Sequence, residues 1–239
     1  MVNEMEDRLL RIRQAEEQSH TEAYSSFELF SDGSWLSKPV KTVLDLLPCF
    51  KDYKTLRVLD LGCGVGRNSI PVAEYFREIP CRIECVDILE MAVSKLMENA
   101  ARYGASEAIH GIVEPIDDYQ IAEDSFDFIM AISALEHMDS QESFIAKLVE
   151  IRSGLRNGGI GCLIMNSSVR EQCKITGEEQ FPQFELNIPT EKLQEILANV
   201  FQGWEILKNT VVHQKYDIPR EYGLSALETD VVTYVVRRK

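Results

Sequence analysis

The stretch RVLDLGCGVGRNS, residues 57–69, decides the fold of this chain. It opens on an apolar run that is typical of a buried strand and continues into three alternating glycines, Gly62, Gly64 and Gly66. Because glycine has no Cβ, such a loop can turn sharply and let another group approach the backbone closely. The pattern therefore predicts a strand that turns into a helix, with a ligand site at the carboxyl end of the strand.

Outward from this loop, short apolar runs alternate with segments of helical periodicity. The runs predict strands over residues 57–61, 82–87, 108–113, 126–132 and 160–166, and the periodic segments predict helices over 89–101 and 140–152. Continuous apolar character indicates strands that are buried on both faces of a parallel sheet. Strand–helix alternation favours right-handed crossovers, so the fold class is α/β with a doubly wound, mostly parallel sheet.

The two ends of the chain add to this unit. A charged, helix-prone extension is expected over residues 1–36, and a helix over 37–47 leads into the domain at 37–239. After Pro189 another apolar helix face precedes two strands, 204–213 and 230–238, joined by the polar segment 214–229. Successive strands without an intervening helix are usually antiparallel neighbours, so the prediction is a seven-stranded sheet with an antiparallel C-terminal strand.

Composition limits the classes of function. With 239 residues and 45% hydrophobic content, the chain can build one full core. It has no apolar run long enough for a bilayer and a charged start unlike a signal peptide, so we expect a cytoplasmic protein without a membrane partner. The net charge of −14 and the lack of a dense Lys/Arg cluster argue against a nucleic-acid partner. Cys81 and Cys85 lack a second Cys/His pair nearby, so no metal site is expected.

A carboxylate joins the glycine loop from the next strand. Asp87 closes that strand about 20 residues after Gly66, where a carboxylate can accept hydrogen bonds from two ribose hydroxyls. A nicotinamide loop would place a third glycine where Arg67 stands. Asp60, before the loop, would repel a pyrophosphate but attract an ammonium or sulfonium. These differences disfavour a nicotinamide oxidoreductase and favour a nucleoside ligand with an amino-acid tail.

Three motifs then resemble a known family. The three stretches are VLDLGCGVGRNS, ECVDIL and EDSFDFIMAISALEHM. They resemble the first, second and fourth motif regions of class I S-adenosylmethionine-dependent methyltransferases, in order and at the expected spacing. The resemblance covers about 57–166, and the final strand pair resembles the closing β-hairpin of the family. GSWLSKPV, FELN and GWEILK are similar to segments of tellurite-resistance-type small-molecule methyltransferases.

This resemblance implies a Rossmann-like methyltransferase fold, S-adenosylmethionine as cofactor and S-adenosylhomocysteine as product. The implied reaction is in-line methyl transfer to a small-molecule acceptor; the alternative is a non-catalytic sensor or partner protein that binds S-adenosylmethionine. Neither the acceptor nor the oligomeric state follows from the motifs.

The resemblance also implies cofactor contacts. The glycine loop would pack against the methionine part, with Asp60 near its amino group, Asp87 on the ribose and Ile88 on one adenine face. Pro115 stands where many relatives have an acid, so Ile116 is the expected adenine contact and Asp117 the reserve. Ser133 would face the methyl group. The implied cofactor-binding residues are Asp60, Gly62, Cys63, Gly64, Asp87, Ile88, Ile116 and Ser133.

Two further groups have alternative interpretations. His137, with Glu136, follows the fourth predicted strand and is either a base or substrate contact or part of a polar pair that caps a loop. Since methyl transfer needs a base only optionally, the catalytic residue is left unassigned, with His137 as the one candidate. Tyr24 and Trp35 either close over the cofactor as a lid or dock the extension onto the domain, and we favour docking.

Overall fold

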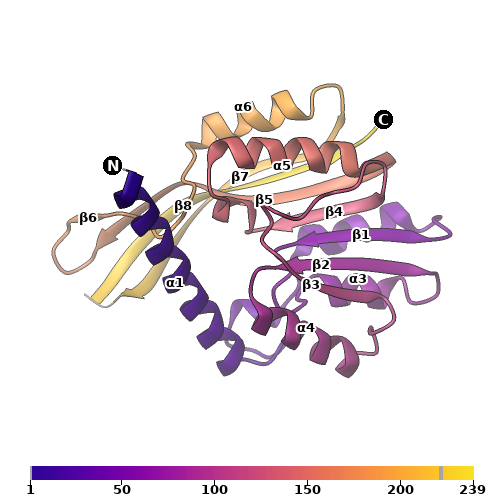
Figure 1. The fold of residues 1–239 in the computed structure, drawn as a ribbon, viewed down its shortest axis with the longest axis horizontal. Helices are drawn as coiled ribbons and strands as arrows, with labels where there is room; N and C mark the ends of the chain where they lie inside the picture. Colours follow the sequence, from indigo (N-terminus) through magenta and orange to yellow (C-terminus); the bar gives the residue numbers. More distant parts are fainter. Residues whose placement is uncertain (1, 221–222) are drawn as a thin grey trace.

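The computed structural model describes residues 2–220 and 223–239 of the chain as a mixed β-sheet with helices on both faces (Figure 1). Seven strands lie in the order β3-β2-β1-β4-β5-β8-β7, and a short β6 pairs with the edge of β5. The strands are β1 (Leu56–Leu61), β2 (Cys81–Asp87), β3 (Ile109–Val113), β4 (Phe126–Ile132), β5 (Leu155–Cys173), β6 (Glu179–Gln180), β7 (Glu205–Arg220) and β8 (Gly223–Arg237).

Neighbours from β3 to β5 are parallel, whereas β8 is antiparallel to both β5 and β7. The order reverses between β1 and β4, so the carboxyl ends of these two strands flank the position where a doubly wound sheet binds ligands. The predicted fold class is thereby confirmed, including the antiparallel C-terminal strand; the two-residue β6 is the addition.

Helices cover the sheet in two layers, and each layer has its own core. The main helices are α1 (Val2–Ser26), α2 (Lys41–Leu46), α3 (Ser69–Tyr75), α4 (Glu90–Arg102), α5 (Gln141–Gly154) and α6 (Thr190–Val200). The core under α5 and α6 includes Phe144, Leu148 and Leu197, all buried. The core under α2, α3 and α4 includes Phe50 and Leu96. The strands between them are apolar on both faces because both faces are covered.

The expected helix over 37–47 is shorter than predicted. α2 covers only Lys41–Leu46, between the 3₁₀ helices η1 (Trp35–Ser37) and η2 (Leu47–Phe50). Lys38 is extended, as a residue before proline prefers. The Val40 N–H then donates to Asn68 Oδ1 at 2.9 Å, so the start of α2 is tied to the glycine-loop region.

The expected polar connection over 214–229 is wrong, because β7 and β8 continue through most of it. Together with the end of β5 they form an extension that we call the β arm, residues 167–173, 213–220 and 223–230. The β arm projects past the end of β4, and α1 lies in front of it in the view of Figure 1. Cross-strand ion pairs hold it, including Lys215 with Glu228 and His213 with Asp230. Lys174 also pairs with Asp217, at 2.8 Å.

Candidate functional site

The glycine loop connects β1 to α3 and needs glycine for its backbone geometry. Gly62, Gly64 and Gly66 have φ of +73°, +52° and +93°, in the left-handed region that side chains disfavour. The N–H groups of Gly62 and Cys63 both donate to the Val86 carbonyl, at 2.8 and 3.0 Å. The loop is therefore bound to the end of β2 as well as to β1.

Gly62 marks the place where three segments meet. A Cβ at Gly62 would overlap the Cβ of Ala134, which precedes the 3₁₀ helix η3 (Leu135–His137), and would lie 3.8 Å from Cδ1 of Ile116. The loop after β1, the loop after β4 and the segment after β3 are thus in direct proximity. This brings Gly62 and Ile116 together at the carboxyl edge of the sheet.

Asp87 connects β2 to the glycine loop. One carboxylate oxygen accepts a hydrogen bond from the Gly64 N–H at 2.8 Å, and the other accepts from the Leu89 N–H at 3.0 Å. The side chain is held by backbone donors on both sides, so its position is fixed relative to the loop. Ile88, next to it, is 54% exposed, an apolar side chain presented to the same edge of the sheet.

Asp60 lies beneath the loop at 1% exposure, and Ser69 Oγ at the start of α3 donates to its carboxylate. Burial, helped by the nearby charge of Asp87, raises its pKa to about 7, although the Ser69 hydrogen bond and Arg67 oppose the shift. A buried carboxyl group that titrates near neutral pH indicates a functional site, in which a cationic ligand group would stabilise the ionised carboxylate. Burial also raises the pKa of the Cys63 thiol, so Cys63 is a neutral side chain of the loop.

Ser133 stands just past β4 in a strained conformation. Its φ is +52°, its side chain is exposed, and its N–H donates to the Ile164 carbonyl at 2.7 Å. A non-glycine residue in this region is uncommon and is often found at functional sites. Every residue predicted for cofactor binding therefore belongs to one of four segments that end at the carboxyl edge of the sheet.

His137 is paired with a residue that sequence reasoning did not single out. Its Nδ1 lies 2.9 Å from Oε2 of Glu185, and its ring stacks on Phe184 with centroids 5.7 Å apart. Glu185 is 8% exposed and lies in the FELN segment before α6, for which the resemblance implies no residue role. Arg13 of α1 contacts Asp139 and lies 4.0 Å from the other Glu185 oxygen. Three distant segments thus converge beside η3.

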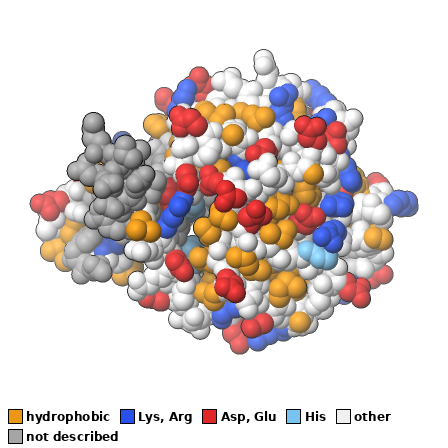
Figure 2. Space-filling view, viewed as in Figure 1, with side chains coloured by type: hydrophobic (Ala, Val, Ile, Leu, Met, Phe, Trp, Pro, Cys, Tyr) orange, Lys and Arg blue, Asp and Glu red, His pale blue; other side chains and the backbone are white. Residues whose placement is uncertain are grey.

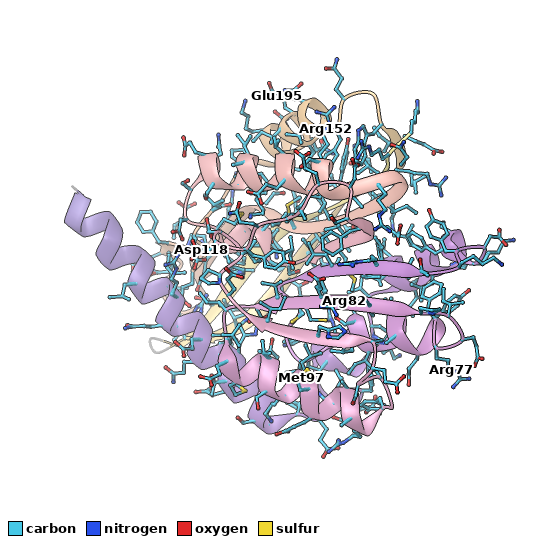
Figure 3. All side chains as sticks on the ribbon, turned by 45° about the vertical axis from the view of Figure 1, so that its right-hand side comes forward. Arg77, Arg82, Met97, Asp118, Arg152 and Glu195 are labelled. Carbon is cyan, nitrogen blue, oxygen red and sulfur yellow. The ribbon has the colours of Figure 1, made fainter. Side chains whose placement is uncertain are left out.

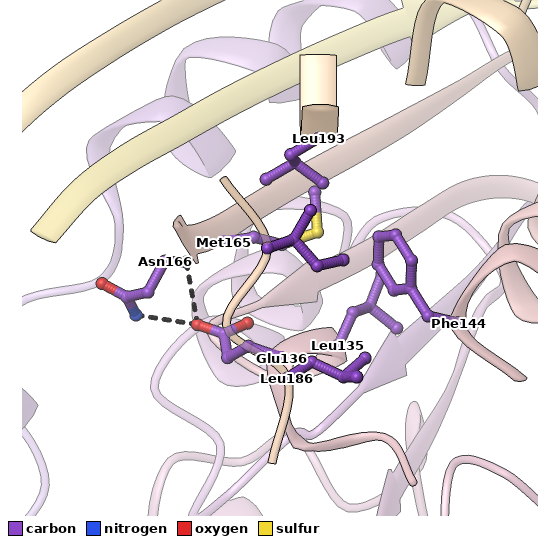
Figure 4. Close-up of a pocket in the computed structure, with 8 residues that line it drawn as sticks. Leu135, Glu136, Phe144, Met165, Asn166, Leu186 and Leu193 are labelled. Carbon is purple, nitrogen blue, oxygen red and sulfur yellow. Dashed lines mark hydrogen bonds between the residues drawn. The ribbon is translucent and has the colours of Figure 1, made fainter. Parts of the chain in front are cut away.

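Glu136 points away from His137, into the protein. Its Oε1 accepts hydrogen bonds from the backbone N–H and the side-chain amide of Asn166, at 3.0 and 2.7 Å (Figure 4). Its Oε2 has no partner among the described residues, and burial raises the pKa of the carboxyl. It lines a small cavity with Phe144 and Met165, of about 10 Å³. Glu136 therefore fastens η3 to β5 and does not face the cleft.

The N-terminal extension lies against the glycine loop. Tyr24 of α1 is 5% exposed, and its hydroxyl would be 2.7 Å from a Cβ placed on Gly64. Lys95 of α4 donates to the Tyr24 carbonyl at 2.7 Å. Arg67 donates to the Trp35 carbonyl at 2.8 Å and its guanidinium lies 5.0 Å from the Trp35 ring centroid. These contacts tie the extension to the loop.

Metal binding and membrane insertion find no support in the described part of the chain. Among the side chains that the structure describes, no three or more of His, Cys, Asp and Glu come together as a metal ion would require. The helices of the described residues include none with the length and apolar character to cross a bilayer. Burial raises the pKa of Cys81 to about 12, so its thiol is a weak candidate for metal ligation.

The comparisons with known proteins agree with the geometry. Residues 58–159 match the family described as "Methyltransferase domain". A mouse tRNA N(3)-cytidine methyltransferase is 29% identical over 111 residues, which are 44% of this chain and 28% of that protein. The matched stretches span 28% to 58% of the lengths of the curated relatives.

Solved structures share the fold. TehB from Haemophilus influenzae superposes with a TM-score of 0.58 at 20% identity, over 82% of this chain and 62% of that one. A 1,6-didemethyltoxoflavin-N1-methyltransferase of Burkholderia thailandensis, solved with S-adenosylhomocysteine, superposes with a TM-score of 0.55 at 19% identity, over 99% and 90% of the two chains. At these identities the likeness establishes the fold.

Proposed function

We propose that this chain is a class I S-adenosylmethionine-dependent methyltransferase, and that it transfers a methyl group from S-adenosylmethionine to a small-molecule acceptor. The observation that carries the proposal is the connection of Asp87 to the Gly64 N–H at 2.8 Å. It fixes a ribose-binding carboxylate against a loop whose glycines leave room for a ligand at the switch point of the sheet.

The residues at this edge suit the cofactor. A carboxylate accepts hydrogen bonds from hydroxyl groups, and the backbone N–H groups of Gly64 and Leu89 fix the Asp87 carboxylate in place for the ribose. Ile88, at 54% exposure, offers an apolar surface to an adenine ring, and Ile116 lies on the other side of the loop near Gly62. Asp60 is a buried counter-charge for the cationic amino-acid part.

When bound, S-adenosylmethionine supplies a methyl group that its positive sulfur activates for displacement. The chain then has to hold the acceptor in line with that methyl group and keep water out. Ser133, exposed past the end of β4, and His137, in η3 a few residues later, are the side chains that we assign to the acceptor. Arg67, directly after the glycine loop, holds the Trp35 ring of the extension at 5.0 Å from its guanidinium.

His137 is equipped to take a proton from an acceptor. Because a carboxylate only accepts hydrogen bonds, Glu185 holds the proton of the neutral ring at Nδ1 and leaves the lone pair at Nε2. A nitrogen or oxygen nucleophile that loses its proton during methylation would use this lone pair. We therefore assign His137 as the base and Glu185 as the residue that orients it.

A small acceptor is favoured over a nucleic acid by charge. The chain carries 39 acidic and 25 basic residues, and phosphate backbones bind through clustered Lys and Arg. On the face shown in Figure 2, acidic side chains are spread over the central region beside exposed hydrophobic ones. The tRNA methyltransferase among the relatives makes tRNA the acceptor to test against.

The experiment is a calorimetric titration of the full chain with S-adenosylmethionine, S-adenosylhomocysteine and NADH, repeated with Asp87→Ala. Micromolar binding of the sulfur ligands alone, lost in the variant, supports the cofactor assignment; binding of NADH alone refutes it. A screen of amines, phenols, thiols and bulk tRNA with labelled methyl donor follows. Transfer to tRNA alone overturns the small acceptor, and cofactor binding without transfer to any class indicates a sensor.

A further inference from the structure

A cavity much larger than the one beside Glu136 lies at the opposite end of the sheet from the glycine loop. It has a volume of about 590 Å³ and is formed where β1 and β2 begin, against the end of α3 and the segment before β3. In Figure 3, Arg77 and Arg82 mark this end, whereas Asp118, which follows β3, lies at the other end. Its volume is in the range of small-molecule sites.

The charged groups that line this cavity are mostly arginines. Arg57, Arg77, Arg82 and Arg156 all contribute, and Glu107 is the acidic residue of the lining. This balance is the opposite of that in the whole chain, which has a net charge of −14. An excess of guanidinium groups around a cavity is the arrangement that proteins use to bind phosphate and carboxylate anions.

Shared carboxylates hold these arginines close together. Arg57 and Arg82 are register partners on β1 and β2, and both contact the same oxygen of Glu84, at 3.0 and 3.2 Å. Arg156 lies 3.4 Å from Asp127, whose other oxygen accepts the Arg57 backbone N–H at 2.8 Å. Two carboxylates thus hold three guanidinium groups close together at the edge of the cavity.

Hydrogen-bonding capacity is left over. Arg57 Nε is buried and has no hydrogen-bond partner among the described residues. Arg77 makes only a 3.6 Å contact with its neighbour Glu78, and both side chains are largely exposed. Although burial opposes the shift, hydrogen bonds from Tyr119 and Arg82 and the charge of Arg57 lower the pKa of Glu84.

Beside the arginines the cavity has an apolar wall, to which Phe76, Ile79 and Pro80 contribute. A ligand with one charged end and one ring would satisfy both parts. We propose that this cavity, which we call the arginine pocket, binds a small organic phosphate of nucleotide size. The phosphate contacts Arg77 and Arg82 and the ring lies on the apolar wall. A long nucleic acid is disfavoured because the net charge of −14 repels an extended polyanion.

The test uses uridine 5′-monophosphate, with uridine as the uncharged control and saturating S-adenosylhomocysteine present to occupy the cofactor cleft. Calorimetry on the full chain should show binding of the phosphate that weakens as salt is raised, and none of uridine. Arg77→Gln and Arg82→Gln should each weaken binding by roughly tenfold or more, because each removes charge-assisted hydrogen bonds. Arg152→Gln, which removes an exposed arginine of α5, should not.

Arg77→Gln keeps the test independent of folding, since the Arg77 side chain is 78% exposed. No binding of the phosphate at millimolar concentration, equal binding of uridine, or equal weakening by Arg152→Gln overturns the proposal. A uridine decamer that binds far more tightly than the monophosphate would also overturn it, in favour of RNA. The readout is phosphate binding and not methyl transfer. A chain that binds no phosphate could therefore still be a methyltransferase, and a chain without methyl transfer could still bind the phosphate.

Discussion

The carboxylate of Asp87 accepts a hydrogen bond from the backbone N–H of Gly64 at 2.8 Å, which joins the end of β2 to the loop after β1. Since the Leu89 N–H donates to the same side chain, one carboxylate organises the loop, the strand end and the start of α4. The residue that we assign to the ribose is therefore also the residue that shapes the cleft.

Asp87→Ala is expected to weaken binding of S-adenosylhomocysteine by roughly a hundredfold, because it removes both the ribose contact and the anchor of the loop. Asp52→Ala, at an exposed turn before β1, is the matched control and should bind like the wild type. Calorimetry measures both. Unchanged affinity in Asp87→Ala would remove Asp87 from the cofactor site.

Comparing Gly62→Ala with Gly177→Ala separates two losses of stability: the clash of a new Cβ with its neighbours, and the strain of a positive φ at a non-glycine residue. Both glycines have φ near +74°, but a Cβ at Gly62 would overlap Ala134, whereas nothing lies within 4 Å of one at Gly177. Gly177→Ala should lower the free energy of unfolding by about 1 kcal/mol, and Gly62→Ala by about 2–3 kcal/mol more. Urea denaturation measures the difference. Equal losses would mean that the approach of η3 to the loop is not tight.

The parts of the fold that the sequence predicted are those with local signals. The apolar strands, the α4 face and the glycine loop each follow from adjacent residues, and the observed bounds of β4, Phe126–Ile132, agree with prediction. The β arm did not follow, because residues such as Lys215 are polar and exposed and are held by partners on the opposite strand, here Glu228. Their pairing depends on contacts that a single strand does not encode.

The candidate site divides in the same way. Asp60 and Asp87 were recognisable because they occupy fixed distances from the glycine loop. Glu185 was not, since its pairing with His137 joins residues 48 positions apart, a contact that the FELN segment alone does not encode. Likewise the arginine pocket combines β1, β2 and β5 residues whose proximity exists only once the sheet is formed.

Tyr24→Ala tests whether the N-terminal extension is docked or acts as a lid. The Tyr24 ring is buried and packs 5.9 Å from the Trp35 ring, centroid to centroid, so its loss should lower the free energy of unfolding by about 3 kcal/mol even without cofactor. Tyr75→Ala, at a half-exposed tyrosine of α3, is the control and should cost much less. Normal stability with weakened S-adenosylhomocysteine binding would instead favour a lid.

His137→Ala is expected to slow methyl transfer by roughly 10²- to 10⁴-fold while leaving the affinity for S-adenosylhomocysteine unchanged, as loss of a base alone would do. Glu185→Gln should slow it less, because the imidazole remains. His213→Ala is a matched control, since His213 also pairs with a carboxylate, Asp230, at 3.0 Å, but lies in the β arm. Initial rates with the acceptor found by the screen provide the measurement. Equal rates in His137→Ala and wild type would exclude a proton-transfer role.

Asp60→Asn should make the chain more stable and yet a poorer cofactor binder. The folded pKa of about 7 lies above the ordinary value of 3.8, so between these values the folded chain retains a proton that the unfolded chain has lost. The unfolded state then binds fewer protons, and the free energy of unfolding falls as pH rises through this window and levels off above about 7. Asparagine at this position is neutral at every pH and avoids this loss.

The melting temperature of Asp60→Asn should therefore exceed that of the wild type at about pH 8, and the difference should shrink towards about pH 5. Binding should change in the opposite direction. Ionised Asp60 attracts the ammonium group of S-adenosylhomocysteine, so wild-type affinity should rise with pH through about 7, and the affinity of the variant should lack this rise. A variant that melts below the wild type at about pH 8 would contradict this, and would mean that the Ser69 hydrogen bond outweighs the cost of burying the charge.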